Sequence, residues 1–336
     1  MDNKEREQFW EILCSLAGTD KINDGKLLRN AIRYPKYLYR YRSVTNNSLE
    51  ALRTNKLYFS SANYYDDPFD TFLNIDIEQL KAEYLSAFQS IESATAVVDG
   101  IKSLFRGKMT KEQEEQLTLE NVLNALNQGL TESFLNSALA LRDDVKKDIW
   151  SVCFSENGFN EVLWLKYANQ HKGFIQFYDL ENDEDFLCGK QAKCKECGVQ
   201  LYGTPLYPIY YSNEPYNATG FAKIVILRKV EEILGRKLPD ELYNGIKMDV
   251  WEQEKITLIK KMCHQYDEEW RMIVGCRMNP PIMREWRPCG VILGLRMEEM
   301  DENNVISTAK EAGIRNIYKS FINAKNELDA RLIYQQ

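Results

Sequence analysis

The sequence predicts an α+β protein: one domain over residues 1–336, built on a split, mostly antiparallel sheet that carries a helical insertion. Three observations support this fold class. Short segments rich in tyrosine, phenylalanine and β-branched residues recur along the chain between turn residues. Residues 76–147 show helical spacing instead. Strand-like segments of one kind stand on both sides of this stretch without a Pro- or Ser-rich linker, so we expect one domain with an insertion.

The composition bounds what the protein can bind. Of 336 residues, 44% are hydrophobic and 28% are charged, which is typical of a soluble globular protein. The net charge of −7 argues against non-specific binding to nucleic acid or to an anionic membrane. No apolar run reaches membrane-spanning length, and the charged N-terminal residues lack the apolar centre of a signal peptide. With eight scattered cysteines, we expect a cytoplasmic protein with reduced thiols.

The first elements are a helix and a strand. Residues 3–18 predict a short amphipathic helix, and residues 37–43 predict a strand. On this strand Arg40 and Arg42 share one face, where two positive charges repel each other unless an anion lies near. A bound anionic ligand would relieve this repulsion, and so would a purely structural carboxylate partner for Arg42.

A second helix and strand follow. Residues 44–56 predict a helix whose cap is Thr45 or Asn47, because both side chains can accept a hydrogen bond from the first turn. Residues 56–61 predict the next strand, which contains Ser60, and the loop after it is stopped by Pro68.

The insertion at 76–147 predicts two to four helices, broken near Gly100 and Gly107. Apolar residues recur there at helical spacing and charged residues fill the other positions. A structural cap is the simplest interpretation. A lid over a site or an oligomer contact is the alternative.

The central unit, residues 148–179, reads as strand, helix and strand. The helix is predicted to end at Lys172-Gly173 because glycine tolerates the left-handed conformation of a helix terminus. On that helix Trp164, Tyr167 and His171 stand at i, i+3 and i+7, which is one face. Such a face suits a pocket wall, and it suits equally a core helix whose polar tips bind backbone. His171 also fits the negative end of its own helix.

A lysine-rich turn with three cysteines follows. Cys194-x-x-Cys197-Gly198 has the form of half a zinc knuckle, with Cys188 nearby. A complete site needs four ligands, and no second Cys-x-x-Cys is present in the sequence. We therefore expect an exposed hairpin, with zinc as the alternative and no other metal.

The last part of the chain holds an acidic motif and the remaining elements. Asp267, Glu268, Glu269 and Arg271 lie just before and within an apolar strand. Because Glu269 and Arg271 are two residues apart, they share a face of the strand; one interpretation is a surface ion pair, and the alternative is a functional role. The other predicted elements are a strand at 206–212, a mainly helical stretch at 217–259 and a short buried strand at 290–295. A helix at 301–313 that ends at Gly313 and a last strand pair beyond 314 complete the prediction.

Common catalytic motifs are absent from the sequence. It contains no Walker loop, Gly-x-Gly-x-x-Gly, His-Glu-x-x-His or Gly-x-Ser-x-Gly. Cys263 and His264 are adjacent, so on a strand they would point to opposite faces and could not form a nucleophile pair.

Several short motifs resemble the bacterial family called domain of unknown function 2971. The family pattern opens with Leu-Tyr-x-Tyr-Arg, continues through Phe-Ser and Asp-Pro-Phe-Asp, then Cys-Phe-Ser-Glu and Trp-x-x-Tyr-Ala-x-x-His-x-Gly, and closes with Glu-x-Glu-Trp-Arg. The matching segments are 38–42, 59–61, 67–70, 153–156, 164–173 and 267–271. Asp267 departs from the first glutamate of the closing motif, which weakens any role that needs a glutamate there. The resemblance covers most of the chain from 38 to about 295.

The order of these parts also resembles ADP-ribosyltransferases of the Arg-Ser-Glu type. That resemblance implies an NAD-using transferase or NAD glycohydrolase, plausible as a bacterial toxin or anti-phage effector. It implies that Arg42 holds phosphate, Ser60 lines the nicotinamide pocket and Glu269 acts on the ribose. His171 is a further catalytic candidate, and the expected nucleotide-binding residues are Arg40, Ser60, Tyr167, Trp164 and Arg271.

A second hypothesis comes from another class of protein. A non-catalytic sensor or interaction module would use the same polar residues to bind a small anionic ligand, a partner protein or an activator. A nucleic-acid enzyme has less support, given the net charge of −7. The catalytic hypothesis requires Arg42, Ser60 and Glu269 to converge on one cleft.

Overall fold

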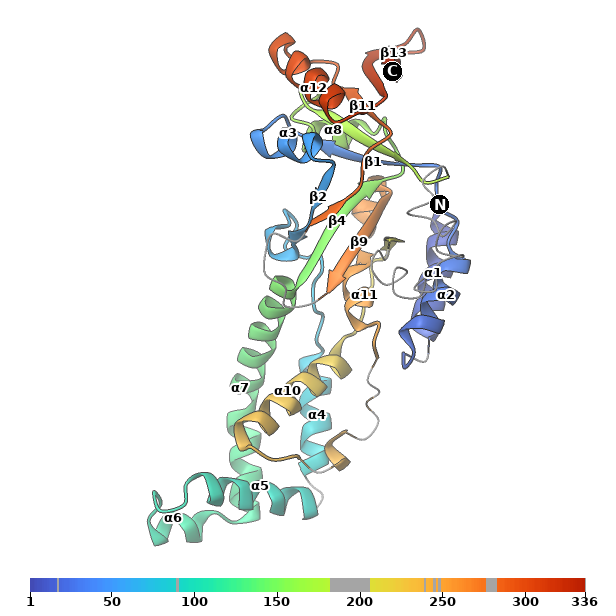
Figure 1. The fold of residues 1–336 in the computed structure, drawn as a ribbon. Helices are drawn as coiled ribbons and strands as arrows, with labels where there is room; N and C mark the ends of the chain where they lie inside the picture. The colour runs from blue at the N-terminus through green and yellow to red at the C-terminus, as the bar shows by residue number, and fades with distance from the viewer. Residues whose placement is uncertain are drawn as a thin grey trace. The chain divides into compact units, whose positions relative to one another are not determined.

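The computed structural model describes residues 1–16, 18–88, 91–181, 206–238, 240–243, 246, 249–275 and 283–335. The chain divides into two compact units (Figure 1). Unit 1 comprises Met1–Thr71, Lys147–Glu214 and Gln253–Gln336. Unit 2 comprises Phe72–Lys146 and Pro215–Glu252.

Unit 1 is built on a nine-stranded sheet with the order β13-β12-β11-β5-β1-β4-β9-β6, and β3 also pairs with β4. Among the described pairs of this sheet, β11 and β12 are parallel and the others are antiparallel. The predicted α+β class with a mostly antiparallel sheet is therefore confirmed. The strands are β1 (Tyr37–Arg42), β3 (Ser60–Ser61), β4 (Ile149–Ser155), β5 (Phe174–Asp179), β6 (Leu206–Pro208), β9 (Glu269–Gly275), β11 (Gly290–Leu293), β12 (Asn316–Ile322) and β13 (Leu328–Gln335).

Among the described pairs of this sheet, β1 and β4 share the shortest pairing. Strand β1 pairs with β5 along its whole length, from Tyr37 opposite Asp179 to Arg42 opposite Phe174. It pairs with β4 at one position, Tyr39 opposite Ser155. The two strands diverge beyond this point, and Figure 1 shows β1 running across the direction of β4 and β9. Two short sheets complete the unit: β2 (Lys56–Tyr58) with β10 (Met283–Glu285), and β7 (Tyr210–Tyr211) with β8 (Ile259–Lys260).

Helices cover both faces of the β11-β5 part of the sheet. One buried cluster joins Phe174 and Leu293 to residues of α3 (Asn46–Arg53) and α12 (Glu299–Glu311). The other joins Ile175 and Ile292 to α8 (Glu161–Tyr167). Neighbouring strand residues therefore alternate between two helical layers, as the pleat of a strand requires. The remaining helices are α1 (Asn3–Ser15), α2 (Lys21–Ala31) and α11 (Glu252–Thr257), with 3₁₀ turns η1 (Ala62–Tyr64) and η4 (Met262–Asp267).

Local capping follows the predicted chemistry in one place and departs from it in another. Thr45 caps α3, accepting from the Ser48 N–H as predicted. Helix α8, however, ends at Tyr167 rather than at Lys172-Gly173, so the predicted helix end was wrong. Three residues with positive φ, Asn169 to His171, follow it. Gly173 is needed for another reason: a Cβ there would collide with the Arg42 carbonyl oxygen.

Unit 2 is helical. The described residues of the insertion form four helices, with a break at Gly107 (φ +77°), whereas Gly100 lies inside a helix. Residues 215–252 belong to this unit as well, so the helical part is larger than the predicted insertion at 76–147. The Asp76 N–H donates to Thr219 Oγ1 at 2.8 Å, and Arg236 donates to the Ala96 carbonyl at 2.6 Å. The helices are α4 (Ile77–Phe88), α5 (Ile91–Leu104), α6 (Lys111–Gln116), α7 (Leu119–Asp148) and α10 (Thr219–Leu234), with η3 (Asp240–Tyr243).

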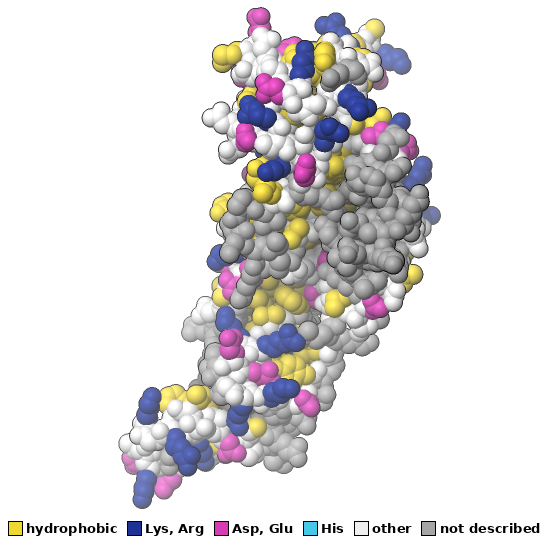
Figure 2. All heavy atoms as spheres, in the orientation of Figure 1, with side chains coloured by type: hydrophobic (Ala, Val, Ile, Leu, Met, Phe, Trp, Pro, Cys, Tyr) yellow, Lys and Arg dark blue, Asp and Glu magenta, His cyan; other side chains and the backbone are white. Residues whose placement is uncertain are grey.

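Two general features of the described residues bear on the expected environment. No described helix combines the length and the apolar character needed to span a membrane. On the face drawn in Figure 2, lysine and arginine side chains of the described residues are interspersed with aspartate and glutamate rather than joined in one stripe.

Candidate functional site

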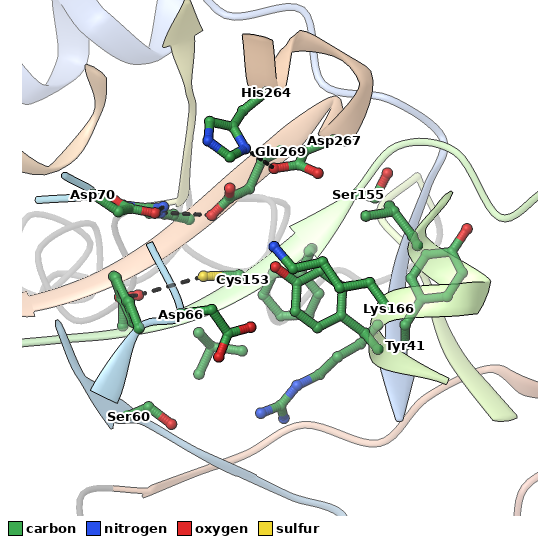
Figure 3. A pocket seen from close by; sticks show the side chains of 18 of the residues that line it. Tyr41, Ser60, Asp66, Asp70, Cys153, Ser155, Lys166, His264, Asp267 and Glu269 are labelled. Carbon is green, nitrogen blue, oxygen red and sulfur yellow. Dashed lines mark hydrogen bonds and ion pairs between the residues drawn. The ribbon is translucent and has the colours of Figure 1, made fainter. Parts of the chain in front are cut away.

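A cavity of about 350 Å³ lies in unit 1, which is within the range of small-molecule binding sites (Figure 3). Elements distant in sequence form its wall: β1, the loop after β3, β4, α8, β8, η4 and β9. The lining residues are Tyr39, Arg40, Tyr41, Arg42, Ser60, Tyr64, Tyr65, Asp66, Asp67, Asp70, Ser151, Val152, Cys153, Phe154, Ser155, Leu163, Lys166, Tyr167, Lys260, His264, Asp267, Glu269 and Arg271.

Most of the residues predicted for the site line this cavity. Arg42, Ser60 and Glu269, which the catalytic hypothesis requires to converge, are all part of its wall. The further predicted residues that line it are Arg40, Tyr167 and Arg271. The two predicted residues that lie outside the lining are Trp164 and His171.

Trp164 of α8 and His171, which follows the helix, pack together. Their rings stack with centroids 5.6 Å apart and an interplanar angle of 7°. Trp164 is fully buried and donates its indole N–H to the Gly158 carbonyl at 3.1 Å. His171 has φ +67°, and its backbone carbonyl accepts from the Arg296 N–H at 3.0 Å. Because α8 ends before His171, the predicted shared face with Tyr167 does not form, and the two side chains separate.

Glu269 lies at the centre of a buried ionic network. Its Oε1 accepts from Arg271 Nε at 2.6 Å and its Oε2 from Lys260 Nζ at 2.8 Å. Glu269 is 6% exposed and Arg271 is 1% exposed. The pair shares a strand face as predicted, but its interpretation as a surface ion pair was wrong.

Arg271 and Lys260 also bind other carboxylates. Arg271 makes a bidentate pair with Asp70, at 2.7 and 2.6 Å, and donates to the Thr257 carbonyl at 2.8 Å. Lys260 Nζ binds Asp267 at 2.8 Å and lies 3.5 Å from Asp70. Each cation therefore bridges carboxylates from different elements, which fixes the loop at Asp70 against β9.

The pKa shifts follow from burial and charge. Burial alone would raise the pKa of Glu269, but the charges of Arg271 and Lys260 outweigh burial and hold it below the ordinary value of 4.5. Burial would lower the pKa of Lys260, yet Glu269 and Asp70 hold it above its usual range. Asp267 differs, because burial raises its pKa more than Lys260 lowers it. Glu269 is thus a carboxylate at neutral pH.

His264 extends the network to Asp67. Its Nε2 lies 3.1 Å from Asp67 Oδ2, and its Nδ1 lies 3.9 Å from Asp267 Oδ2. His264 Nδ1 and Asp267 Oδ1 are buried and have no hydrogen-bond partner among the described residues. A buried polar atom in this state needs an explanation, such as a bound water or ion or a catalytic role.

Arg40 and Arg42 differ from Lys260 and Arg271, which bind carboxylates. No ion pair joins Arg40 or Arg42 to a carboxylate of the described residues. Arg40 donates to the Tyr58 carbonyl at 3.3 Å. The charge of Arg40, with burial, lowers the pKa of Arg42 to about 9, and burial lowers the pKa of Arg40. The buried Tyr178 hydroxyl, which interacts electrostatically with both, has no hydrogen-bond partner among the described residues. This donor set is suited to an anion.

The remaining cavity residues limit the chemistry. Burial, with the charge of Glu269, raises the pKa of Cys153 to about 12, so it is a neutral thiol rather than a thiolate nucleophile. Ser151 lies between Cys153 and Tyr65, with its Oγ 3.7 Å from the sulfur and hydrogen-bonded to the Tyr65 hydroxyl. Ser60 is exposed to the cavity.

Several cavity residues were not predicted. Asp70 and Asp67 belong to the Asp67-Pro68-Phe69-Asp70 segment that carries part of the family resemblance, so a signal for them was present. Asp66 directly precedes that segment but is not part of its pattern, and Lys166 and Lys260 are lysines in largely apolar stretches, which gives no comparable signal for a site. Tertiary structure alone brings them to the cavity (Figure 3).

The described residues hold no group of three or more His, Cys, Asp or Glu side chains placed to bind a metal ion. The weak zinc prediction concerned Cys188, Cys194 and Cys197, which lie outside the described residues. No protein-family model, curated protein or solved structure matches this chain. The functional argument therefore depends on the cavity itself.

Proposed function

We propose that the cavity binds NAD and that the protein is an ADP-ribosyltransferase-like enzyme or an NAD glycohydrolase. One observation carries the proposal: two arginines without a carboxylate partner among the described residues share a cavity with a buried, ionised glutamate. An enzyme that consumes NAD in a bacterial cytoplasm would serve as a toxin or an anti-phage effector.

The arginine pair would bind the pyrophosphate. A guanidinium is planar, permanently charged and able to donate two parallel hydrogen bonds to phosphate oxygens. Arg40 and Arg42 lie on the same face of β1, and the charge of Arg40 lowers the pKa of Arg42. A bound dianion removes this repulsion, so binding would gain free energy that the empty site lacks.

Glu269 would stabilise the reacting ribose. When the bond between the nicotinamide nitrogen and C1′ breaks, its electron pair leaves with nicotinamide and positive charge develops on the ribose. A fixed carboxylate stabilises that charge at no cost of reorganisation. Lys260 and Arg271 hold Glu269 ionised and in place. A carboxylate has about four lone-pair positions, so two remain for a ribose hydroxyl. Water or an acceptor side chain then attacks C1′ and loses a proton to solvent.

The same contacts support a second candidate function. Both oxygens of Glu269 already accept hydrogen bonds from cations, which offset its charge. A sensor or interaction module that binds a nucleotide without cleaving it would need no more than this. The two candidates differ in turnover rather than in ligand.

Incubation of the purified protein with NAD, alone and with cell lysate, tests the proposal. We expect nicotinamide release or a labelled macromolecule, strongly reduced in Glu269→Gln and Arg42→Gln and unchanged in Arg53→Gln, an exposed arginine of α3. Calorimetric binding without any product would support the sensor instead. If the protein gives no product and binds no NAD, both candidate functions are wrong.

A further inference from the structure

We propose that the carboxylates of this cavity recognise a positively charged ring, so that the site selects the oxidised dinucleotide NAD⁺ over its reduced form, with Asp66 as the specificity-determining residue. The inference rests on the proposed function. It adds a preference between two ligands of nearly the same shape, which differ by the charge of the pyridinium.

The acidic side of the cavity carries excess negative charge. Four carboxylates meet there, those of Asp67, Asp70, Asp267 and Glu269. Two permanent cations, Lys260 and Arg271, offset half of them. Two of the four carboxylate charges therefore remain uncompensated by these two cations, and a further cation, Lys166, lines the cavity with its Nζ 4.9 Å from the Tyr167 ring centroid.

Asp66 adds a further carboxylate that is free to meet a ligand. It lines the cavity and is exposed, and no hydrogen bond or ion pair joins it to any other described residue. Figure 3 shows its carboxylate directed into the cavity rather than towards Asp70 or Glu269. Asp66 is therefore a charge that the protein itself does not neutralise.

Asp267 provides an independent observation. It is 4% exposed and lines the cavity, yet its Oδ1 has no donor among the described residues. A buried carboxylate oxygen without a hydrogen-bond donor has lost its hydration, and no hydrogen bond offsets the desolvation free energy. A positive charge bound in the cavity would stabilise it, which a neutral ring would not do.

The two signs of charge are separated within one cavity. No carboxylate contributes to the pKa shift of Arg40, which Tyr178 and Cys153 influence, or to that of Arg42, which Arg40 and Tyr178 influence. A ligand that satisfies both regions must carry an anion at one end and a cation at the other. NAD⁺ has this polarity, with its pyrophosphate and its pyridinium. Reduction adds a hydride and removes the positive charge while the pyrophosphate is unchanged.

The test uses carbocyclic NAD⁺ and its reduced form, because a CH₂ in place of the ribose ring oxygen prevents cleavage and isolates binding. Calorimetry at low salt on the full-length protein should give at least tenfold tighter binding of the oxidised form. Asp66→Asn should reduce that ratio roughly threefold to tenfold without changing the affinity for ADP-ribose. Asp66→Glu should restore the ratio. Asp301→Asn, in the first turn of α12, is the control and should leave it unchanged.

The outcomes separate the inference from the proposed function. Equal affinity for the two forms in the wild-type protein would overturn the inference while nucleotide binding stood. A wild-type preference that survives in both Asp66→Asn and Asp67→Asn would also overturn it. Failure of the wild-type protein to bind either form, or ADP-ribose, would count against the proposed function itself.

Discussion

Replacing Arg42 by methionine should stabilise the free protein and abolish anion binding. Arg42 has no ion-pair partner among the described residues and lies beside Arg40, a like charge. Methionine keeps most of the side-chain length and removes the charge. A residue that serves a ligand rather than the fold often has this effect, since sites commonly sacrifice stability for function.

The size of the effect follows from the pKa. A pKa lowered from 12.5 to about 9 means that the charged guanidinium is less favourable in the folded than in the unfolded chain. At 1.36 kcal/mol per pKa unit, the full shift would correspond to a destabilisation of the folded protein of about 5 kcal/mol. Water reaches the half-buried side chain and screens the repulsion, so we expect a gain of about 1–3 kcal/mol. This destabilisation by the charged Arg42 is fully present at pH 7 and decreases as the pH rises above about 9.

Urea denaturation at pH 7, followed by tryptophan fluorescence, measures this gain. Every tryptophan except Trp251 lies in unit 1, so the signal reports mainly on the unit that holds the cavity. The wild-type protein should gain stability when ADP-ribose is added, because the ligand binds the folded state, and Arg42→Met should not. The two effects together distinguish a binding residue from a structural one.

Arg53→Met is the matched control. Arg53 is exposed on α3 and pairs with Glu50 and Glu311, so its removal should change the unfolding free energy by less than about 0.5 kcal/mol. If Arg42→Met instead loses 2 kcal/mol or more, Arg42 stabilises the fold through a partner. The anion-site reasoning would then be wrong.

Three further predictions concern the network and α8. Arg271→Met should lower the unfolding free energy by about 3–5 kcal/mol in urea, because it leaves the Glu269 and Asp70 carboxylates buried without their cation. The lowered pKa of Glu269 gives stability that is present above pH 4.5 and lost as pH falls below it, so the stability of the wild-type protein should decrease more steeply between pH 5 and 3 than that of Glu269→Gln. His171→Ala should cost about 1 kcal/mol through the lost stacking on Trp164, with nucleotide affinity unchanged in calorimetry; weaker affinity at full stability would return His171 to the site.

The sheet could be predicted from local pattern. Strand β4 has the predicted bounds, Ile149–Ser155, and Thr45 caps α3, because alternation and capping are properties of a few neighbouring residues. The end of α8 could not be predicted in this way. Gly173 looked like a helix stop, but it is glycine because the Arg42 carbonyl passes close to it, which is a contact between distant segments. The three residues of positive φ before it are not glycine and give no local signal.

The site was predictable to the extent that its residues occur in motifs. Arg42, Ser60 and Glu269 were chosen from three separate segments, and all three line the cavity. Lys260 was missed, although it binds Asp267 and Glu269, because a lysine two residues before a 3₁₀ turn resembles any surface lysine. His171 was included for its type, and the early end of α8 turns it away to Trp164.

A crystal structure of the protein soaked with ADP-ribose tests the central claim most directly. The account predicts pyrophosphate oxygens within hydrogen-bond distance of both the Arg40 and Arg42 guanidinium groups, with a ribose hydroxyl on Glu269. A nucleotide bound elsewhere on the chain, or a cavity in which Arg40 and Arg42 turn to pair with Asp66 and leave the phosphates free, would contradict it.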